Sequence, residues 1–269
     1  MSTEIISKKY SEQAKIVNLS KAITGDNKIH IKGLVGSSFS FVIQALFAKS
    51  DNSFLLLCNE KEEAAYILND LEQLVGDQDV LFYPSSYRRP YQIEDTDNAN
   101  VLLRSEVLNR LNSRKKPAII VSYPEAIFEK VVTKKELEKN TLKISIGDQV
   151  SIDFINEVLF EYEFKRVDFI TEPGEFSVRG GILDVFSFSN DNPYRIEFFG
   201  NEVDSIRTFD VATQLSIEKK NKIAIIPNFE NKFLQENRES FLEYINARTT
   251  IFIQNTDLLL THLDKLFSK

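Results

Sequence analysis

The sequence predicts an α/β protein in which a parallel-sheet domain carries a small inserted α+β module. Apolar strand-like segments alternate with amphipathic helical segments between residues 29 and 130, which is typical of a parallel sheet covered by helices on both faces. Residues 141–210 change to short alternating strands separated by turns, which indicates an antiparallel sheet. Strand–helix alternation resumes after residue 217. The simplest topology is an insertion: residues 1–128 and 214–269 form the first domain, and residues 129–213 form the insert.

The first domain begins with 30 residues that are polar and helical in pattern. The clearest helix follows at 61–75, where Ala64, Ile67, Leu68 and Leu71 recur at helical spacing on one side. Short apolar runs that are bounded by turn residues are expected to be buried strands. In chain order, the expected strands are 29–31, 54–58, 80–83 and 118–121, and the expected helices are 41–49, 61–75 and 98–112.

The module begins after a charged helical linker at 125–139, with a strand at 141–145 and a helix at 155–161. Antiparallel hairpins follow, and Gly200-Asn201 between two of their strands is a two-residue hairpin signal, because Gly adopts a positive φ without strain. The C-terminal return completes the first domain. Its expected strands are 223–226 and 250–253, and its expected helices are 236–246 and 257–267.

Composition narrows the classes of function. The chain has 269 residues, 42% of them hydrophobic, which is enough for a sizeable core. Its net charge of −7 argues against a dedicated nucleic-acid-binding module, which normally carries a basic surface. The single cysteine, Cys58, lies in an expected buried strand, so we expect a reduced, cytoplasmic protein. No apolar run reaches membrane length, and we expect no membrane partner.

A degenerate phosphate loop lies at residues 33–40, between an expected strand and an expected helix. The pattern G-x-x-x-x-G-K-[ST] matches at Gly33 and Ser40, but Ser38 stands where the second glycine belongs and Phe39 where the lysine belongs. Gly36 does not restore the spacing. Phenylalanine supplies no charge for phosphates, so we expect a vestigial nucleotide-binding fold, that is, a degenerate P-loop NTPase-like (RecA-like) domain.

The sequence gives little indication of a catalytic site. His30 and His262 are far apart in sequence and Cys58 is expected in the core, so neither a Cys-His pair nor a zinc set is indicated. We expect no catalytic residue, no metal site and no cofactor in this segment. Arg88 and Arg89 lie in a loop with tyrosines and prolines, which is either a nucleic-acid contact or a solvated loop.

The most informative segment is 172–210. It contains eight acidic residues, three arginines (Arg179, Arg195 and Arg207) and no lysine. Arginine without lysine on a net-acidic sheet suggests bidentate pairing with carboxylates of a protein more than phosphate binding. The competing interpretation is an ordinary solvated hairpin face.

Two runs of this segment carry a resemblance to a known family. They are 179–186, Arg-Gly-Gly-Ile-Leu-Asp-Val-Phe, and 193–210, which begins Pro-Tyr-Arg-Ile-Glu-Phe-Phe-Gly-Asn. The chain resembles the N-terminal UvrB-homology module of bacterial transcription-repair coupling factors (Mfd), with supporting pieces at 82–84, 90–91, 121–126 and 225–227. The excision-repair protein UvrB is similar but more divergent, and it keeps its loop lysine, so Phe39 favours the coupling factor. The chain is about as long as that N-terminal module, so we expect it to be an N-terminal fragment of a longer protein.

The resemblance implies a non-catalytic recruitment module whose inserted domain docks UvrA, the damage-recognition ATPase of nucleotide excision repair. The contacts implied are Arg179, Arg195 and Phe199. Strand alternation puts Arg195 and Phe199 on one face with Glu197 between them, and Glu197 could hold Arg195 in place. Arg207 is then expected to be a structural partner of nearby acidic residues.

The same resemblance implies that the full-length parent is an ATP-dependent DNA translocase. Its motor region would use ATP and magnesium, and it would contact RNA polymerase and double-stranded DNA. Other domains of the parent are expected to mask the UvrA face in an autoinhibitory contact. One alternative is a UvrB-like nucleotide-dependent helicase fragment that binds ATP and damaged DNA. Another is a module that mainly locks the parent in a resting conformation.

Overall fold

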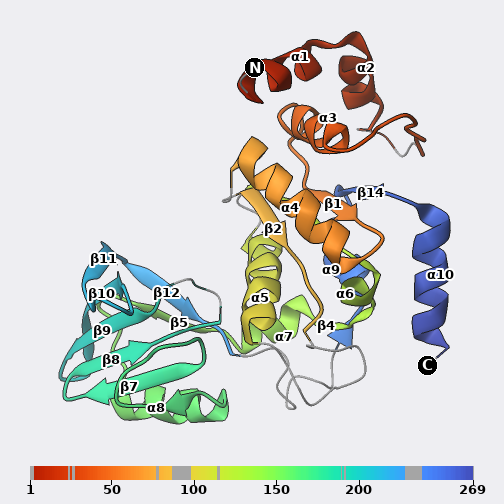
Figure 1. The fold of residues 1–269 in the computed structure, drawn as a ribbon. Helices are drawn as coiled ribbons and strands as arrows, with labels where there is room; N and C mark the ends of the chain where they lie inside the picture. Colours follow the sequence, from red (N-terminus) through yellow and green to blue (C-terminus); the bar gives the residue numbers. More distant parts are fainter. Residues whose placement is uncertain are drawn as a thin grey trace. The chain divides into compact units, whose positions relative to one another are not determined.

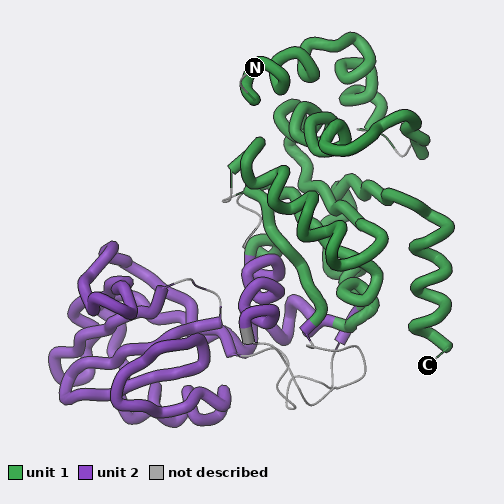
Figure 2. Tube along the Cα trace, viewed as in Figure 1, with its two compact units in different colours: residues 1–85, 110–130, 240–269 green, residues 86–109, 131–239 purple. Residues whose placement is uncertain are grey.

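A computed structural model describes residues 3–23, 25, 28–76, 79–86, 98–113, 116–188, 190, 192–227 and 238–268. The chain divides into two compact units (Figure 2). Unit 1 comprises residues 1–85, 110–130 and 240–269, and unit 2 comprises residues 86–109 and 131–239. Unit 2 therefore runs beyond the expected insert of 129–213 and also takes up most of the helix expected at 98–112.

Unit 1 is built on a four-stranded sheet of order β14-β1-β3-β2, in which every neighbouring pair is parallel. Every residue of the two central strands is buried, as expected for parallel strands that are covered on both faces. The parallel sheet predicted from strand–helix alternation is confirmed. The bounds are β1 Phe54–Leu57, β2 Val80–Phe82, β3 Ile119–Ser122 and β14 Thr250–Ile253.

The helices of unit 1 follow the predicted apolar spacing. Helix α4 turns Ala64, Ile67 and Leu71 into the interior. Helix α3 lies beside α1, α2 and α4 (Figure 1), and the rings of Tyr10 and Phe41 stack 5.2 Å apart. The bounds are α1 Thr3–Glu12, α2 Ala14–Ala22, α3 Ser38–Phe47, α4 Lys61–Val75, α6 Pro124–Phe128, α9 Phe241–Tyr244 and α10 Thr256–Phe267.

Unit 2 contains a six-stranded sheet of order β11-β10-β9-β8-β7-β6, antiparallel except for the β6–β7 pair. The Gly200-Asn201 hairpin is confirmed, because Phe199 pairs with Glu202 and only Gly200 of the two turn residues has a positive φ, +63°, as in a type II′ turn. The bounds are β6 Lys165–Arg166, β7 Glu175–Arg179, β8 Ile182–Val185, β9 Tyr194–Phe199, β10 Glu202–Phe209 and β11 Ser216–Lys219.

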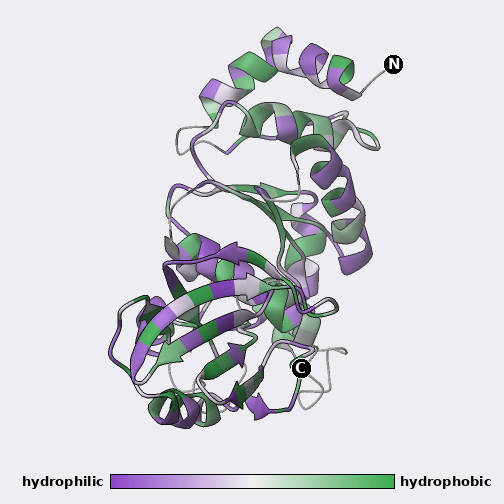
Figure 3. Ribbon diagram, turned by 90° about the vertical axis from the view of Figure 1, so that its left-hand side faces the viewer, coloured by the Kyte–Doolittle hydropathy of each residue, from purple (hydrophilic) through white to green (hydrophobic). Residues whose placement is uncertain are grey.

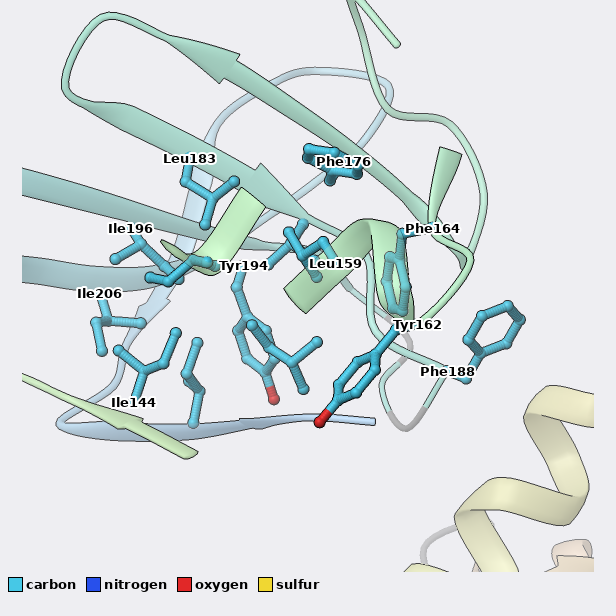
Figure 4. Packing of buried hydrophobic residues seen from close by; sticks show 14 of the residues in the cluster. Ile144, Leu159, Tyr162, Phe164, Phe176, Leu183, Phe188, Tyr194, Ile196 and Ile206 are labelled. Carbon is cyan, nitrogen blue, oxygen red and sulfur yellow. The ribbon is translucent and has the colours of Figure 1, made fainter. Parts of the chain in front are cut away.

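One face of this sheet packs against helix α8 (Ile152–Glu161), which begins at the N-cap Ser151. Ile155 and Leu159 of α8 are fully buried in one core with inward-facing strand residues. Leu159 lies near Phe176 and Ile196 in that core (Figure 4). The two-stranded β5–β12 ladder (Leu142–Ser145 and Lys222–Ile225) adds Ile144 and Ile223 to the same core. Unit 2 also contains β4 Val131–Val132, α7 Lys134–Lys139, β13 Arg238–Glu239 and residues 98–109 of α5 Asn98–Ser113.

Two expected elements are wrong. Residues 28–35 form no regular secondary structure, although a strand was expected at 29–31. Ile29 and Ile31 are 40% and 37% exposed, and a strand needs a neighbouring strand to satisfy its backbone groups, which sequence alternation alone cannot supply. The helix expected at 236–246 begins only at Phe241, where Ser240 and Glu243 form a capping box, and residues 236–237 lie outside the described part.

Candidate protein-docking site

The second face of the six-stranded sheet, opposite the core, carries the residues that the sequence singled out. Hydrophilic and hydrophobic residues alternate along the strands (Figure 3). In β9, Tyr194 and Ile196 are buried, whereas Phe199 is exposed and Arg195 and Glu197 are partly exposed. We call this second face the outer face. It is defined by Arg179, Asp184, Arg195, Glu197, Phe199, Ser205 and Arg207.

Arg195 is held on three sides. Its Nε and Nη2 donate to Oδ1 and Oδ2 of Asp184 at 2.7 and 2.8 Å, which is a bidentate pair, and Nη2 also donates to Oε1 of Gln214 at 3.0 Å. The guanidinium lies 4.2 Å above the centre of the Phe209 ring. The hydrogen bonds to Asp184 raise the pKa of Arg195, and its side chain is 15% exposed. Arg195 is thus a fixed cation with a small accessible surface.

Arg179, at the end of β7, shares the same carboxylate and is more open. Its Nη2 donates to Oδ2 of Asp184, and its side chain is 41% exposed. Its guanidinium carbon lies 5.4 Å from the ring centre of Phe169, which is itself 67% exposed. The sequence reasoning missed Phe169, because it lies between β6 and β7 in a segment without a strand pattern. A large aromatic residue in that segment was the only available signal.

Phe199 ends β9 immediately before the hairpin and is 84% exposed. It shares the outer face with Arg195, as alternation predicted, but the structure does not bring the two together. Four residues of strand separate them by roughly 13 Å. The outer face therefore offers two separate features: an arginine pair around Asp184, with Phe169 beside it, and a single aromatic ring at the hairpin.

Glu197 does not hold Arg195, and that expectation is wrong. Its carboxylate pairs with Arg207 and accepts a hydrogen bond from Ser205 Oγ at 2.7 Å. The reason is register: Asp184 lies directly opposite Arg195 on β8, whereas Ser205 of β10 lies opposite Glu197. The hydrogen bond from Ser205, followed by the charge of Arg207, lowers the pKa of Glu197. The structural role expected for Arg207 is confirmed.

The degenerate phosphate loop has positive φ at Gly33 (+86°) and Gly36 (+56°). Two of its three hydroxyl groups make hydrogen bonds within the protein: Ser38 Oγ accepts from the backbone N–H of Val35 at 2.7 Å, and Ser40 Oγ donates to Asp70 at 3.1 Å. Ser40 is 1% exposed, and the loop 33–40 contains no cationic side chain. At the two positions where the phosphate-loop pattern has lysine and a hydroxyl residue, the chain therefore has an uncharged Phe39 and a buried Ser40.

The histidine and cysteine that the sequence singled out have partners or burial of their own. His262 Nδ1 lies 3.1 Å from the carbonyl oxygen of Asn59, and burial raises the pKa of the Cys58 thiol to about 12. In the part of the chain that the structure describes, no group of three His, Cys, Asp or Glu side chains could hold a metal ion. Arg88 and Arg89 lie outside that part. None of the described helices is long and apolar enough to cross a membrane.

Comparisons with known proteins identify the segment that bears the outer face. A model of the family described as UvrB interaction domain matches residues 142–230. The transcription-repair-coupling factor of Bacillus subtilis (strain 168) is 32% identical over 218 residues, which are 81% of this chain and 18% of that protein. That of Haemophilus influenzae is 28% identical over 205 residues, or 76% of this chain and 18% of that protein. That of Staphylococcus epidermidis (strain RP62A) is 32% identical over 207 residues, or 76% and 17%.

The chain spans less than a fifth of the length of these relatives. The resemblance that the arginine-bearing segment carried is confirmed. Residues 142–230 match the UvrB interaction domain family, within a chain that is similar over most of its length to one part of the transcription-repair-coupling factors.

Proposed function

We propose that this chain is a non-catalytic recruitment module that binds UvrA through the outer face of its six-stranded sheet. In a longer protein it would link a stalled RNA polymerase to nucleotide excision repair. The observation that carries the proposal is the outer face itself, where Arg179 is 41% and Phe199 84% exposed on a sheet whose other face is core. The contact would consist of Arg179, Arg195 and Phe199.

The physical basis is the chemistry of protein interfaces. Arginine and large aromatic residues are the side chains that most often dominate binding energy, especially when they are held in place before the partner arrives. Arg195 is fixed by Asp184, Gln214 and Phe209, and Arg179 is fixed by Asp184. Both guanidinium groups remain planar donors suited to carboxylates or carbonyl oxygens of a protein partner. The net charge of −7 disfavours DNA as the main partner of this segment.

The decisive experiment is a calorimetric titration of UvrA into variants of this chain. Because a central interface residue is often worth ~2 kcal/mol, we expect Arg179→Ala combined with Arg195→Ala to weaken binding by more than tenfold, and Phe199→Ala to weaken it about as much. Arg166→Ala on β6 removes an exposed arginine, and Phe154→Ala removes a half-exposed phenylalanine from α8. These controls are expected to bind normally. Unchanged affinity of the double arginine variant would refute the proposal.

The absence of catalysis is supported by the phosphate loop, in which Phe39 replaces lysine and Ser40 donates to Asp70. ATP and magnesium would then act only in the motor region of the parent, which we propose to be an ATP-dependent DNA translocase. Titration of this chain with Mg-ATP at millimolar concentration is expected to give no binding heat. Saturable binding that Phe39→Ala or Ser40→Ala abolishes would favour a UvrB-like nucleotide-dependent role instead.

In the full-length parent we propose that other domains cover the outer face until the protein engages RNA polymerase and DNA. UvrA should then bind this chain more tightly than the resting full-length protein. Equal UvrA affinity of this chain and of the full-length protein would argue against masking. It would not bear on the docking proposal, which the titration of the arginine variants tests.

A further inference from the structure

A single buried carboxylate organises the arginine pair of the outer face. Asp184 lies in the middle of β8 and is 2% exposed. Oδ1 accepts from Nε of Arg195, and Oδ2 accepts from Nη2 of both Arg195 and Arg179. Both carboxylate oxygens are therefore engaged by cations that come from two different strands. The third arginine of the face, Arg207, pairs with Glu197 instead.

Strand register explains why Asp184 can pair with both Arg179 and Arg195. Asp184 lies opposite Arg195 on β9 and opposite Ser177 on β7, and Ser177 is two residues before Arg179 on the same face. The carboxylate thus reaches one arginine directly across the ladder and the other along a diagonal, which long side chains can span. Because Ser177 has a small side chain, it does not keep the side chain of Arg179 from reaching Asp184.

We propose that Asp184 is a positioning residue of the docking face: it sets the orientation of Arg179 and Arg195 before UvrA binds. The inference rests on the proposed function. A free arginine side chain samples many rotamers and loses that freedom on binding, whereas a guanidinium already fixed by a carboxylate loses less. Gln214 supports the same arrangement, because its side chain accepts from Arg195 while donating to the carbonyl oxygen of Val211.

Asp184 also sets the charge of the pair. The two guanidinium groups and the carboxylate together carry one net positive charge, while Arg207 and Glu197 neutralise each other. An amide in place of the carboxylate keeps the shape but offers one acceptor oxygen, and its N–H groups face guanidinium donors. The arginines would then lose their common anchor.

The test is UvrA affinity of Asp184→Asn and Asp184→Glu in the complete chain, at a temperature where circular dichroism shows every variant folded. We expect about tenfold weaker binding for Asp184→Asn, comparable to loss of one arginine, and partial recovery for Asp184→Glu, because the longer carboxylate restores the charge. Glu175→Gln is the matched control. It removes another buried carboxylate of the same sheet, one that accepts from Thr171 and from the backbone of Glu172.

Because loss of a buried carboxylate can simply destabilise the sheet, a double-mutant cycle with the arginines separates positioning from destabilisation. A positioning role predicts that Asp184→Asn has little further effect on affinity once Arg179 and Arg195 are both alanine. An equal loss of affinity in both backgrounds would overturn the inference, and so would wild-type affinity of Asp184→Asn. If the double arginine variant itself binds UvrA normally, the proposed function fails, which is a different result from either of these.

Discussion

At the scale of single residues, the ion pair of Glu197 and Arg207 gives the outer face a measurable pH dependence. The hydrogen bond from Ser205 and the charge of Arg207 lower the pKa of Glu197 below its ordinary value of 4.5. A carboxylate with a lowered pKa in the folded state stabilises that state above the unfolded pKa, and the stabilisation disappears as pH falls through the folded pKa. The affected range therefore lies below about pH 4.5.

We expect Glu197→Gln to lower the free energy of unfolding by ~0.5 kcal/mol near neutral pH, the usual size for a partly exposed ion pair, and by progressively less as pH falls below that range. Urea denaturation at a series of pH values measures the difference. Glu157→Gln on α8 is the control, because exposed Glu157 makes no ion pair with the described residues. A constant difference between wild type and Glu197→Gln at every pH would contradict the prediction.

Sequence patterns predicted the face on which these residues lie but not their partners. Alternation along a strand is local, so it placed Arg195, Glu197 and Phe199 together on one side. Which carboxylate meets Arg195 depends on the register between β8 and β9, and register is set by pairing between separate segments. For the same reason Phe169 could not be placed beside Arg179 from the sequence, because it lies in a segment without a strand pattern.

At the scale of elements, two glycines with positive φ differ in what surrounds them. Gly174 precedes β7 with φ +89°, and a Cβ built there would lie 2.6 Å from Cζ of the buried Phe188. Gly200 in the β9–β10 hairpin has φ +63° and nothing within 4 Å of its Cβ position. Both positions disfavour a side chain through the backbone, but only Gly174 adds overlap with the core.

We expect Gly200→Ala to cost about 1 kcal/mol of stability through backbone strain alone. Gly174→Ala should cost about 2–4 kcal/mol, because displacement of Phe188 adds to the strain. Denaturant midpoints of the two variants measure both costs. Equal costs would mean that the ring of Phe188 moves aside without loss of packing.

The elements themselves were predictable where burial is continuous. Strand β1 is an uninterrupted apolar run and β3 is apolar up to its last residue, Ser122. Helix α4 has the apolar spacing of an amphipathic helix, so each was identified within a few residues. The expected strand at 29–31 failed, because three alternating residues do not specify a neighbouring strand. Helix α9 is short because its start is fixed by the Ser240–Glu243 capping box, a signal that the apolar pattern of 236–246 obscured.

At the scale of the whole molecule, each unit has buried side chains of its own. Leu159 of α8 is fully buried in the core of unit 2, and Leu71 of α4 is fully buried in unit 1. The unit 2 core consists of residues from that unit alone. A cavity made in one core should therefore destabilise mainly the same unit, because the lost contacts are local.

We expect Leu159→Ala and Leu71→Ala each to destabilise their own unit by about 2–5 kcal/mol, the usual cost of a large cavity. Hydrogen exchange followed by mass spectrometry measures the amide protection of each unit separately within one chain. Leu159→Ala should reduce amide protection in β7–β10 and leave β1 and β3 protected, and Leu71→Ala should do the reverse. The two variants are matched in chemistry and burial, so each is the control of the other. Loss of protection throughout the chain in both variants would mean that the units unfold as one, and docking variants of the outer face would then have to be tested for the integrity of unit 1 as well.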